Sequence, residues 1–392
     1  MERAPAGRST AHSGREQSDR LAGIAFLVIL SVHVCLLAYA ATVHSPVSTE
    51  AELLAAGLSH LDIGAFGLYR VNPPLVRTVA SVPVAFACPR LDWRLYDADP
   101  GRRSEYAVGA AFSLDNRRRL QHFVVLGRWA CIPFSVIGAI VCFSWAKSLY
   151  GSASGVVSSA LWCFSPMIIG HGHLLTSDVG AAALGAGAAY TFWMWLREPC
   201  WWRAFFAGVV LGLAELTKLT LILFFGLWPI LWVIWRLSGR SREMGRGDAP
   251  SSQQGLQLCA LLFLGLYCLN AGYLFDGSCQ ALKDYHFGSH MLSGTGAGVR
   301  PGGSRNRLAD TWLAGVPVPF PKDYVYGIDQ QRRYFEGDVA SYLRGEWRSP
   351  GWWYYYLYAL LVKIPFGYWG IALLAATRRL LDRQAGAWRD DC

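Results

Sequence analysis

Long apolar segments that carry almost no charge recur along this chain of 392 residues. A segment of about 20 such residues matches the hydrocarbon core of a bilayer, which is roughly 30 Å thick. We therefore predict an all-α polytopic membrane protein with about eight spans, or seven because the fifth segment is short. The segments are residues 21–43, 122–146, 152–169, 179–196, 204–216, 219–235, 256–275 and 352–376.

The basic residues indicate how these spans are oriented. The formal charge of +9 does not point to nucleic acid, because clusters of Lys and Arg lie at alternate ends of the predicted spans. Both termini are then predicted to be cytoplasmic, in the plasma or inner membrane. Residues 1–20 form a disordered tail, 21–377 the transmembrane domain and 378–392 a second tail, while 44–121 and 276–351 are external.

The first external segment is predicted to contain two helices. Leu54, Leu58 and Leu61 share one helical face, which predicts an amphipathic helix lying along the membrane surface. Pro73 and Pro74 fit the first turn of a second, more apolar helix.

The start of the first of these helices contains two glutamates with different expected roles. Thr49 and Glu52 have the spacing of a capping box, which explains Glu52 structurally. Glu50 has no such role. It either favours the helix N-terminus by its charge or faces an external cleft as a general base.

The stretch HGHLLTSDV lies between the third and fourth predicted spans. Thr176, Ser177 and Asp178 are favourable helix-capping residues, and this interpretation suffices for them by itself. His171 and His173 form an H-x-H pair that could hold a metal ion, although no further ligand stands at a diagnostic spacing.

Glu215 and Lys218 stand three residues apart within apolar sequence. Ionisable groups at membrane depth are costly and are usually paired or functional. The alternatives are an i, i+3 ion pair and anion binding by Lys218.

Four short patterns occur in order along the chain. They are TEAELLAAGLSHL with NPPLVR, then SPMIIGHGHLLTSDV, then GVVLGLAELTK, and finally GWWYYY with KIP. In this order they resemble the GT-C membrane glycosyltransferases, in particular the bacterial relatives of protein O-mannosyltransferases and of lipid A aminoarabinose transferases. The resemblance covers about residues 20 to 375.

The resemblance implies a GT-C-like bundle with external juxtamembrane helices. It also implies inverting transfer of a sugar from a polyprenyl-phosphate donor to a hydroxyl of a protein, lipid or glycan. No cofactor is specified by the sequence, and a divalent metal is the one option. The phosphate then needs a cation near the membrane face, and the acceptor needs a carboxylate base. The residues carried over are Glu50 and Asp178 as catalytic groups and His171, Lys218, Arg70 and Asn72 as donor-binding groups.

Two other classes of function are alternatives. A transporter or flippase would have many spans and an intramembrane Glu/Lys pair, but large external segments and the absence of repeats argue against it. A truncated or catalytically impaired relative that acts as a membrane scaffold is favoured by Thr49, which stands where the family's Asp is expected, and by the short C-terminus.

Overall fold

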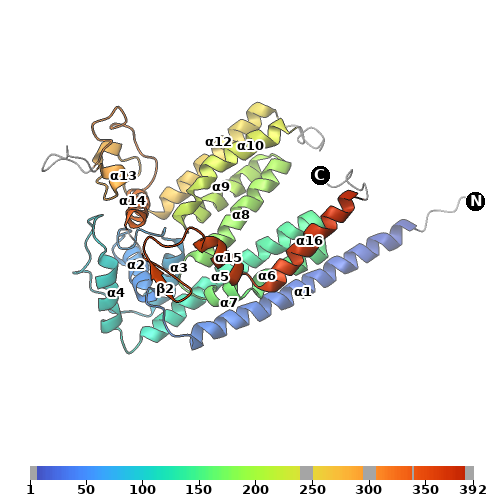
Figure 1. Ribbon diagram of the computed structural model, residues 1–392, viewed down its shortest axis with the longest axis horizontal. Coiled ribbons are helices and arrows are strands. Elements are labelled where there is room, and N and C mark those ends of the chain that lie inside the picture. Colours follow the sequence, from blue (N-terminus) through green and yellow to red (C-terminus); the bar gives the residue numbers. More distant parts are fainter. Residues whose placement is uncertain (1–6, 239–249, 295–305, 338–339, 385–392) are drawn as a thin grey trace, which may run out of the picture. The chain divides into compact units, whose positions relative to one another are not determined.

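The computed structural model describes residues 7–238, 250–294, 306–337 and 340–384, which are mostly helical (Figure 1). Within these ranges, five helices are long and apolar enough to cross a membrane, or six if one bent helix pair counts as a span. This fits an all-α membrane protein. The five are Glu16–Val43, Leu120–Tyr150, Asp178–Arg197, Leu219–Leu237 and Ser252–Gly272.

Eight spans are not confirmed, and the reasons are local. The predicted third span is divided between α6 (Ser152–Cys163) and α7 (Pro166–His171), because the residue before a proline avoids the helical conformation. The predicted fifth span, α9 (Trp201–Glu215), has 15 residues and is therefore only about 22 Å long. The eighth is bent by 95° between α15 (Tyr355–Lys363) and α16 (Phe366–Gln384), again beside a proline.

The described residues form two compact units. The smaller contains residues 165–167 and 337 onwards, with α15, α16 and the antiparallel hairpin of β1 (Ser341–Leu343) and β2 (Glu346–Arg348). The larger contains the bundle. Its remaining helices are α1 (Gly7–Val43), α2 (Glu50–Asp62), α3 (Leu75–Phe86), α4 (Ser104–Asp115), α5 (Leu120–Tyr150), α8 (Asp178–Arg197), η1 (Leu219–Ile222), α10 (Leu223–Leu237), α12 (Ser251–Gly272), η2 (Leu282–Asp284), α13 (His290–Ser293) and α14 (Lys322–Glu336).

The predicted tails are shorter in the structure. Residues 7–20 belong to helix α1 and are not a disordered tail, whereas residues 1–6 lie outside the described residues. At the other end α16 continues to Gln384, and residues 385–392 are not described.

Small residues let the bundle helices pack closely. A Cβ added at Gly208 would lie 2.7 Å from the carbonyl oxygen of Leu261, and one at Gly212 would lie 2.3 Å from Cβ of Cys268. Helices α9 and α12 therefore meet backbone to backbone, as small residues allow in membranes. Figure 1 shows α8, α9, α10 and α12 as neighbours in this bundle.

A polar contact holds α1 to the hairpin of α5 and α6. The buried ring of His33 makes hydrogen bonds through Nδ1 to the carbonyl of Cys163 and through Nε2 to the Ser135 hydroxyl, each 2.8 Å long. Both ring nitrogens are thus satisfied inside an apolar span, where an unpaired polar group would be costly.

Helices α2, α3 and α4 gather at the end of the bundle where α5 and α8 begin (Figure 1). Leu54 and Leu58 are fully buried here while Leu61 is exposed, and α2 packs against α3 and α4. The prediction that α2 lies along a membrane surface is therefore wrong, because protein covers its apolar face. Gly57 permits the crossing, since a Cβ there would lie 2.2 Å from the Arg77 carbonyl oxygen.

Candidate functional site

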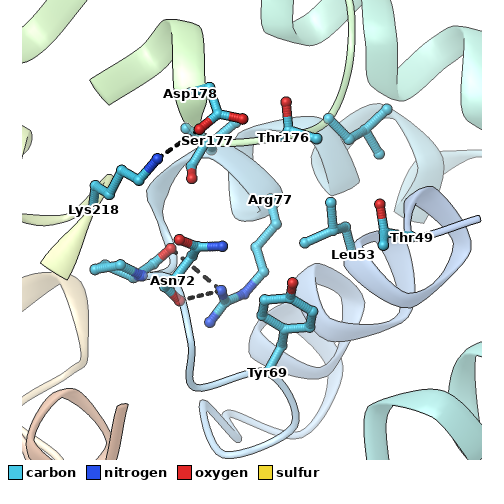
Figure 2. Close-up of a pocket in the computed structure, with 12 residues that line it drawn as sticks. Thr49, Leu53, Tyr69, Asn72, Arg77, Thr176, Ser177, Asp178 and Lys218 are labelled. Carbon is cyan, nitrogen blue, oxygen red and sulfur yellow. Dashed lines mark hydrogen bonds and ion pairs between the residues drawn. The ribbon is translucent and has the colours of Figure 1, made fainter. Parts of the chain in front are cut away.

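A cavity of about 240 Å³ lies at this end of the bundle. It is formed by the start of α2, the segment leading into α3, the segment leading into α8, and the connection between α9 and α10. Figure 2 shows that most of its labelled side chains are polar. The lining residues are Thr49, Leu53, Tyr69, Asn72, Pro73, Val76, Arg77, Leu175, Thr176, Ser177, Asp178 and Lys218.

Asp178 and Lys218 form an ion pair at the cavity. Lys218 Nζ lies 2.6 Å from Asp178 Oδ1, and the two side chains are 35% and 56% exposed (Figure 2). Asp178 is the first residue of α8, so its charge is favoured by the helix dipole. The prediction that Asp178 opens an apolar span is confirmed, although Ser177 occupies the cap position and makes no side-chain capping bond.

The proposed ion pair between Glu215 and Lys218 does not form. The helix of α9 ends at Glu215 and the backbone of Lys218 is extended, so the i, i+3 relation is lost. Glu215 is buried and accepts a hydrogen bond of 2.9 Å from the Tyr324 hydroxyl. Lys218 is thereby directed to the cavity.

Arg77 is the buried cation of the site. It is only 2% exposed, and among the described residues no carboxylate lies within ion-pair distance of it. Its Nη1 donates to the carbonyls of Asn72 and Pro73, and its guanidinium lies 5.5 Å from the centre of the Tyr69 ring. Nη2 is buried without a hydrogen-bond partner. Burial lowers the pKa of Arg77 to about 10, so the side chain remains charged at neutral pH.

Neutral donors accompany this charge. The hydroxyl of Thr176 lies at the cavity, is buried and has no hydrogen-bond partner. Burial raises the pKa of the Tyr69 hydroxyl, which therefore keeps its proton and can donate it. A cavity with an uncompensated guanidinium, an ammonium and free hydroxyls suits an oxyanion ligand.

His60 accepts a hydrogen bond from Arg77. Arg77 Nε donates to His60 Nε2 over 3.4 Å, and His60 Nδ1 lies 2.6 Å from the Thr78 hydroxyl, which itself donates to the carbonyl of Pro74. Nδ1 therefore carries the proton and Nε2 is the acceptor. Burial, followed by the charge of Arg77, holds the pKa of His60 well below its usual value of 6.5.

This arrangement predicts a pH-dependent stability. As the pH falls through about 6.5, the unfolded chain takes up a proton at His60 that the folded protein excludes, so stability is lost by up to about 1.4 kcal/mol per pH unit. His60→Gln should lack this component, because glutamine can accept from Arg77 but does not titrate. Unfolding of both proteins between pH 7.5 and 5 measures the difference, and parallel curves would contradict the assignment.

Glu50 lies elsewhere and is not exposed to a cleft as predicted. Its carboxylate accepts two hydrogen bonds from Arg128, of 2.8 and 2.7 Å, and both side chains are fully buried. Arg128 also donates to the carbonyls of His44 and Ser45, and Glu50 accepts from the backbone N–H of Val47. The pair joins α1, α2 and α5. Because Glu50 is fully buried in this ion pair, it does not face solvent as a general base.

The predicted capping box is also wrong. Thr49 makes no side-chain capping bond and instead lines the cavity. Glu52 Oε2 is buried without a partner, and burial together with the nearby Glu105 raises the pKa of Glu52. Burial and the charge of Glu105 both disfavour the ionised form of Glu52 at this position.

Of the remaining predicted donor-binding residues, one lines the cavity and two do not. Asn72 lines the cavity, and its carbonyl orients Arg77. Arg70 does not line it: the side chain is buried in an ion pair of 2.6 Å with Asp323 of α14. His171 also lies outside the cavity lining, because it ends α7 before the chain turns toward α8.

The H-x-H pair does not assemble a metal site in the described residues. His173 is buried, and its Nε2 lies 3.2 Å from Nδ1 of His44, not beside His171. No group of three or more His, Cys, Asp or Glu side chains is placed to hold a metal ion within the described ranges.

Two buried charges were missed from the sequence, Arg77 and Arg128. Each is an arginine inside a markedly apolar helix, α3 or α5. That placement was the available signal, since a charge in such a helix is costly unless it is paired or used.

Comparison of the chain with protein-family models, with curated proteins and with solved structures gives no match. The geometry of the site therefore carries the functional argument.

Proposed function

We propose that the protein transfers a sugar from a polyprenyl-phosphate-linked donor to an acceptor hydroxyl of a protein, lipid or glycan on the external face of the membrane. The observation that carries this proposal is Arg77, a buried cation with an unpaired N–H at a cavity beside the start of a candidate span. The phosphate of a lipid-linked sugar would lie at the membrane face, where such a span begins.

The donor phosphate binds at Arg77 and Lys218. Hydrogen bonds to ionised groups contribute about 1.5–3 kcal/mol each, and a guanidinium offers its N–H groups in a fixed fork. Helix α8 begins at the cavity, so the positive end of its dipole also favours an anion there. Cavities that enclose a drug-sized ligand measure about 300–1,000 Å³. The smaller cavity here accommodates the phosphate and sugar, with the polyprenyl chain among the spans.

Asp178 is the general base of this proposal, in place of Glu50. Its carboxylate lines the cavity and is more than half exposed. The acceptor hydroxyl loses its proton to Asp178 while its oxygen forms a bond to the anomeric carbon. The bond from that carbon to the phosphate oxygen breaks on the opposite side, so the configuration inverts and polyprenyl phosphate leaves with the electron pair. Lys218 and Arg77 stabilise the charge that develops on it.

The orientation follows from the basic residues. Lys147, Arg197 and Arg236 lie at the ends of α5, α8 and α10 that are opposite to the cavity. Since basic residues are enriched on the cytoplasmic side, we propose that both termini are cytoplasmic and that the cavity is external, in the plasma or inner membrane.

Replacement of Arg77 tests the phosphate site. Arg77→Gln should weaken binding of undecaprenyl phosphate about 10- to 100-fold, since it removes the positive charge and the Nη2 donor, which has no partner within the described residues. Arg77→Lys keeps the charge and should retain most of the affinity. Binding is measured by microscale thermophoresis in detergent, with folding followed by tryptophan fluorescence.

Transfer itself is measured with radiolabelled polyprenyl-phosphate sugars offered to the protein in membranes. If Arg77→Gln binds undecaprenyl phosphate as tightly as the unmodified protein, the phosphate site is misplaced. If the unmodified protein binds the lipid but transfers none of the sugars, a lipid-phosphate-binding scaffold replaces the enzyme.

A further inference from the structure

A second and larger cavity, of about 680 Å³, lies at the junction of α4 and α5. It shares no residue with the first cavity. Four arginines and one carboxylate dominate its lining, so its charge is strongly positive. The lining residues are Cys88, Arg90, Leu114, Asp115, Asn116, Arg117, Arg118 and Arg119.

Asn116 connects the two chain segments that form this cavity. Its side chain is 6% exposed, and its Oδ1 accepts from the backbone N–H of Arg90 while its Nδ2 donates to the carbonyls of Arg90 and Phe112. Arg119 adds a second connection, because Nη2 donates to the carbonyl of Ala87 over 2.8 Å. The arginines are thus held around the cavity by a fixed backbone.

Three of the four guanidinium groups are available to a ligand. Arg119 stacks on the Phe123 ring at 4.7 Å in addition to its bond to Ala87. Arg90, Arg117 and Arg118 are exposed, and their side chains make no ion pair or hydrogen bond within the described part of the chain. The four arginines outnumber the single carboxylate of the lining, so their like charges repel one another and an anionic ligand would relieve that repulsion.

The cavity lies where a membrane surface is expected. Arg117, Arg118 and Arg119 directly precede α5, a candidate span that begins at Leu120. Two strongly exposed apolar side chains flank the arginines: Phe86, 84% exposed at the end of α3, and Leu114, 69% exposed near the end of α4. At a membrane interface, apolar side chains enter the acyl region of the lipids, and neighbouring cationic side chains bind the lipid phosphates.

We infer that this cavity binds the headgroup of an anionic phospholipid. The phosphate lies among Arg90, Arg117 and Arg118, and the acyl chains lie along Phe86 and Leu114. The inference is independent of glycosyl transfer, since it concerns a separate cavity and a bulk lipid. It also explains a basic cluster at the end of the bundle where basic residues are disfavoured in the orientation given above.

Cys88 is a built-in reporter of occupancy, because it is an exposed thiol at the cavity. The purified protein is placed in nanodiscs of phosphatidylcholine alone or with 30% phosphatidylglycerol, and maleimide labelling of each cysteine is followed by peptide mass spectrometry. Phosphatidylglycerol should slow labelling of Cys88 at least fivefold. Cys279, which is exposed outside the cavity, should change little and controls for a general surface-charge effect.

Arg117→Gln with Arg118→Gln removes two of the free charges. Each basic residue near an anionic surface contributes about fivefold to binding, so the double variant should bind short-chain phosphatidylglycerol in detergent about 25-fold more weakly. Arg332→Gln with Arg333→Gln removes two adjacent arginines from α14 and should leave binding unchanged.

Three outcomes overturn the inference. Labelling of Cys88 is the same in both nanodiscs, or the α14 variant loses as much affinity as the variant beside α5, or inorganic phosphate at equal concentration displaces phosphatidylglycerol completely. The last result would mean that the cavity binds free phosphate and not a lipid.

Discussion

Glu50→Gln is expected to destabilise the folded protein by about 3–5 kcal/mol. The carboxylate of Glu50 is the only counter-charge that the described residues provide for the fully buried guanidinium of Arg128. Glutamine has nearly the same shape but leaves this charge unpaired in a fully buried position. The loss should appear as a lowered midpoint in denaturant titrations of the protein in detergent micelles, followed by tryptophan fluorescence.

Two further variants separate charge from packing at this position. Glu52→Gln lies two residues away, and burial and the nearby Glu105 already raise the pKa of Glu52, which disfavours its charged form. That variant should change stability by no more than about 1 kcal/mol. Glu50→Leu with Arg128→Met removes both buried charges and should recover most of the stability, as apolar replacement of a buried ion pair often does. A Glu50→Gln protein that is stable but inactive would restore Glu50 as the base.

Asp178→Asn is expected to slow sugar transfer by a factor of about 10² to 10⁴, which is the usual contribution of a general base. The fold should persist, since the ion pair with Lys218 is partly exposed and contributes at most about 1 kcal/mol. Binding of undecaprenyl phosphate should also persist, because the cations Arg77 and Lys218 remain.

The matched control is Asp310→Asn, which removes an exposed carboxylate away from the cavity. It should transfer sugar at the rate of the unmodified protein. An Asp178→Asn variant with full transfer activity would show that this carboxylate only favours the start of α8. A variant that loses lipid binding as strongly as Arg77→Gln would instead place Asp178 in the donor site as a structural group.

Hydropathy and local helix signals were sufficient for part of this molecule. They located the five long apolar helices, and they placed the start of a span at Asp178, because each of these features depends on neighbouring residues. They did not show where a proline divides an apolar segment into two helices, as happens before Pro166. Mean hydropathy averages over such a break, which arises because the residue before a proline avoids the helical conformation. The helix over Glu50 to Asp62 was predicted, but its burial was not, because other helices cover its apolar face.

The partners of the charges were decided by the tertiary structure alone. Lys218 pairs with Asp178, 40 residues away, and not with its near neighbour Glu215, while Arg128 pairs with Glu50 across 78 residues. An ion pair in a region of low polarity depends on which helices meet, and sequence spacing does not contain that information. The same argument applies to Arg77. Its residue type and apolar surroundings could be read from the sequence, but that it faces a cavity without a counter-charge could not.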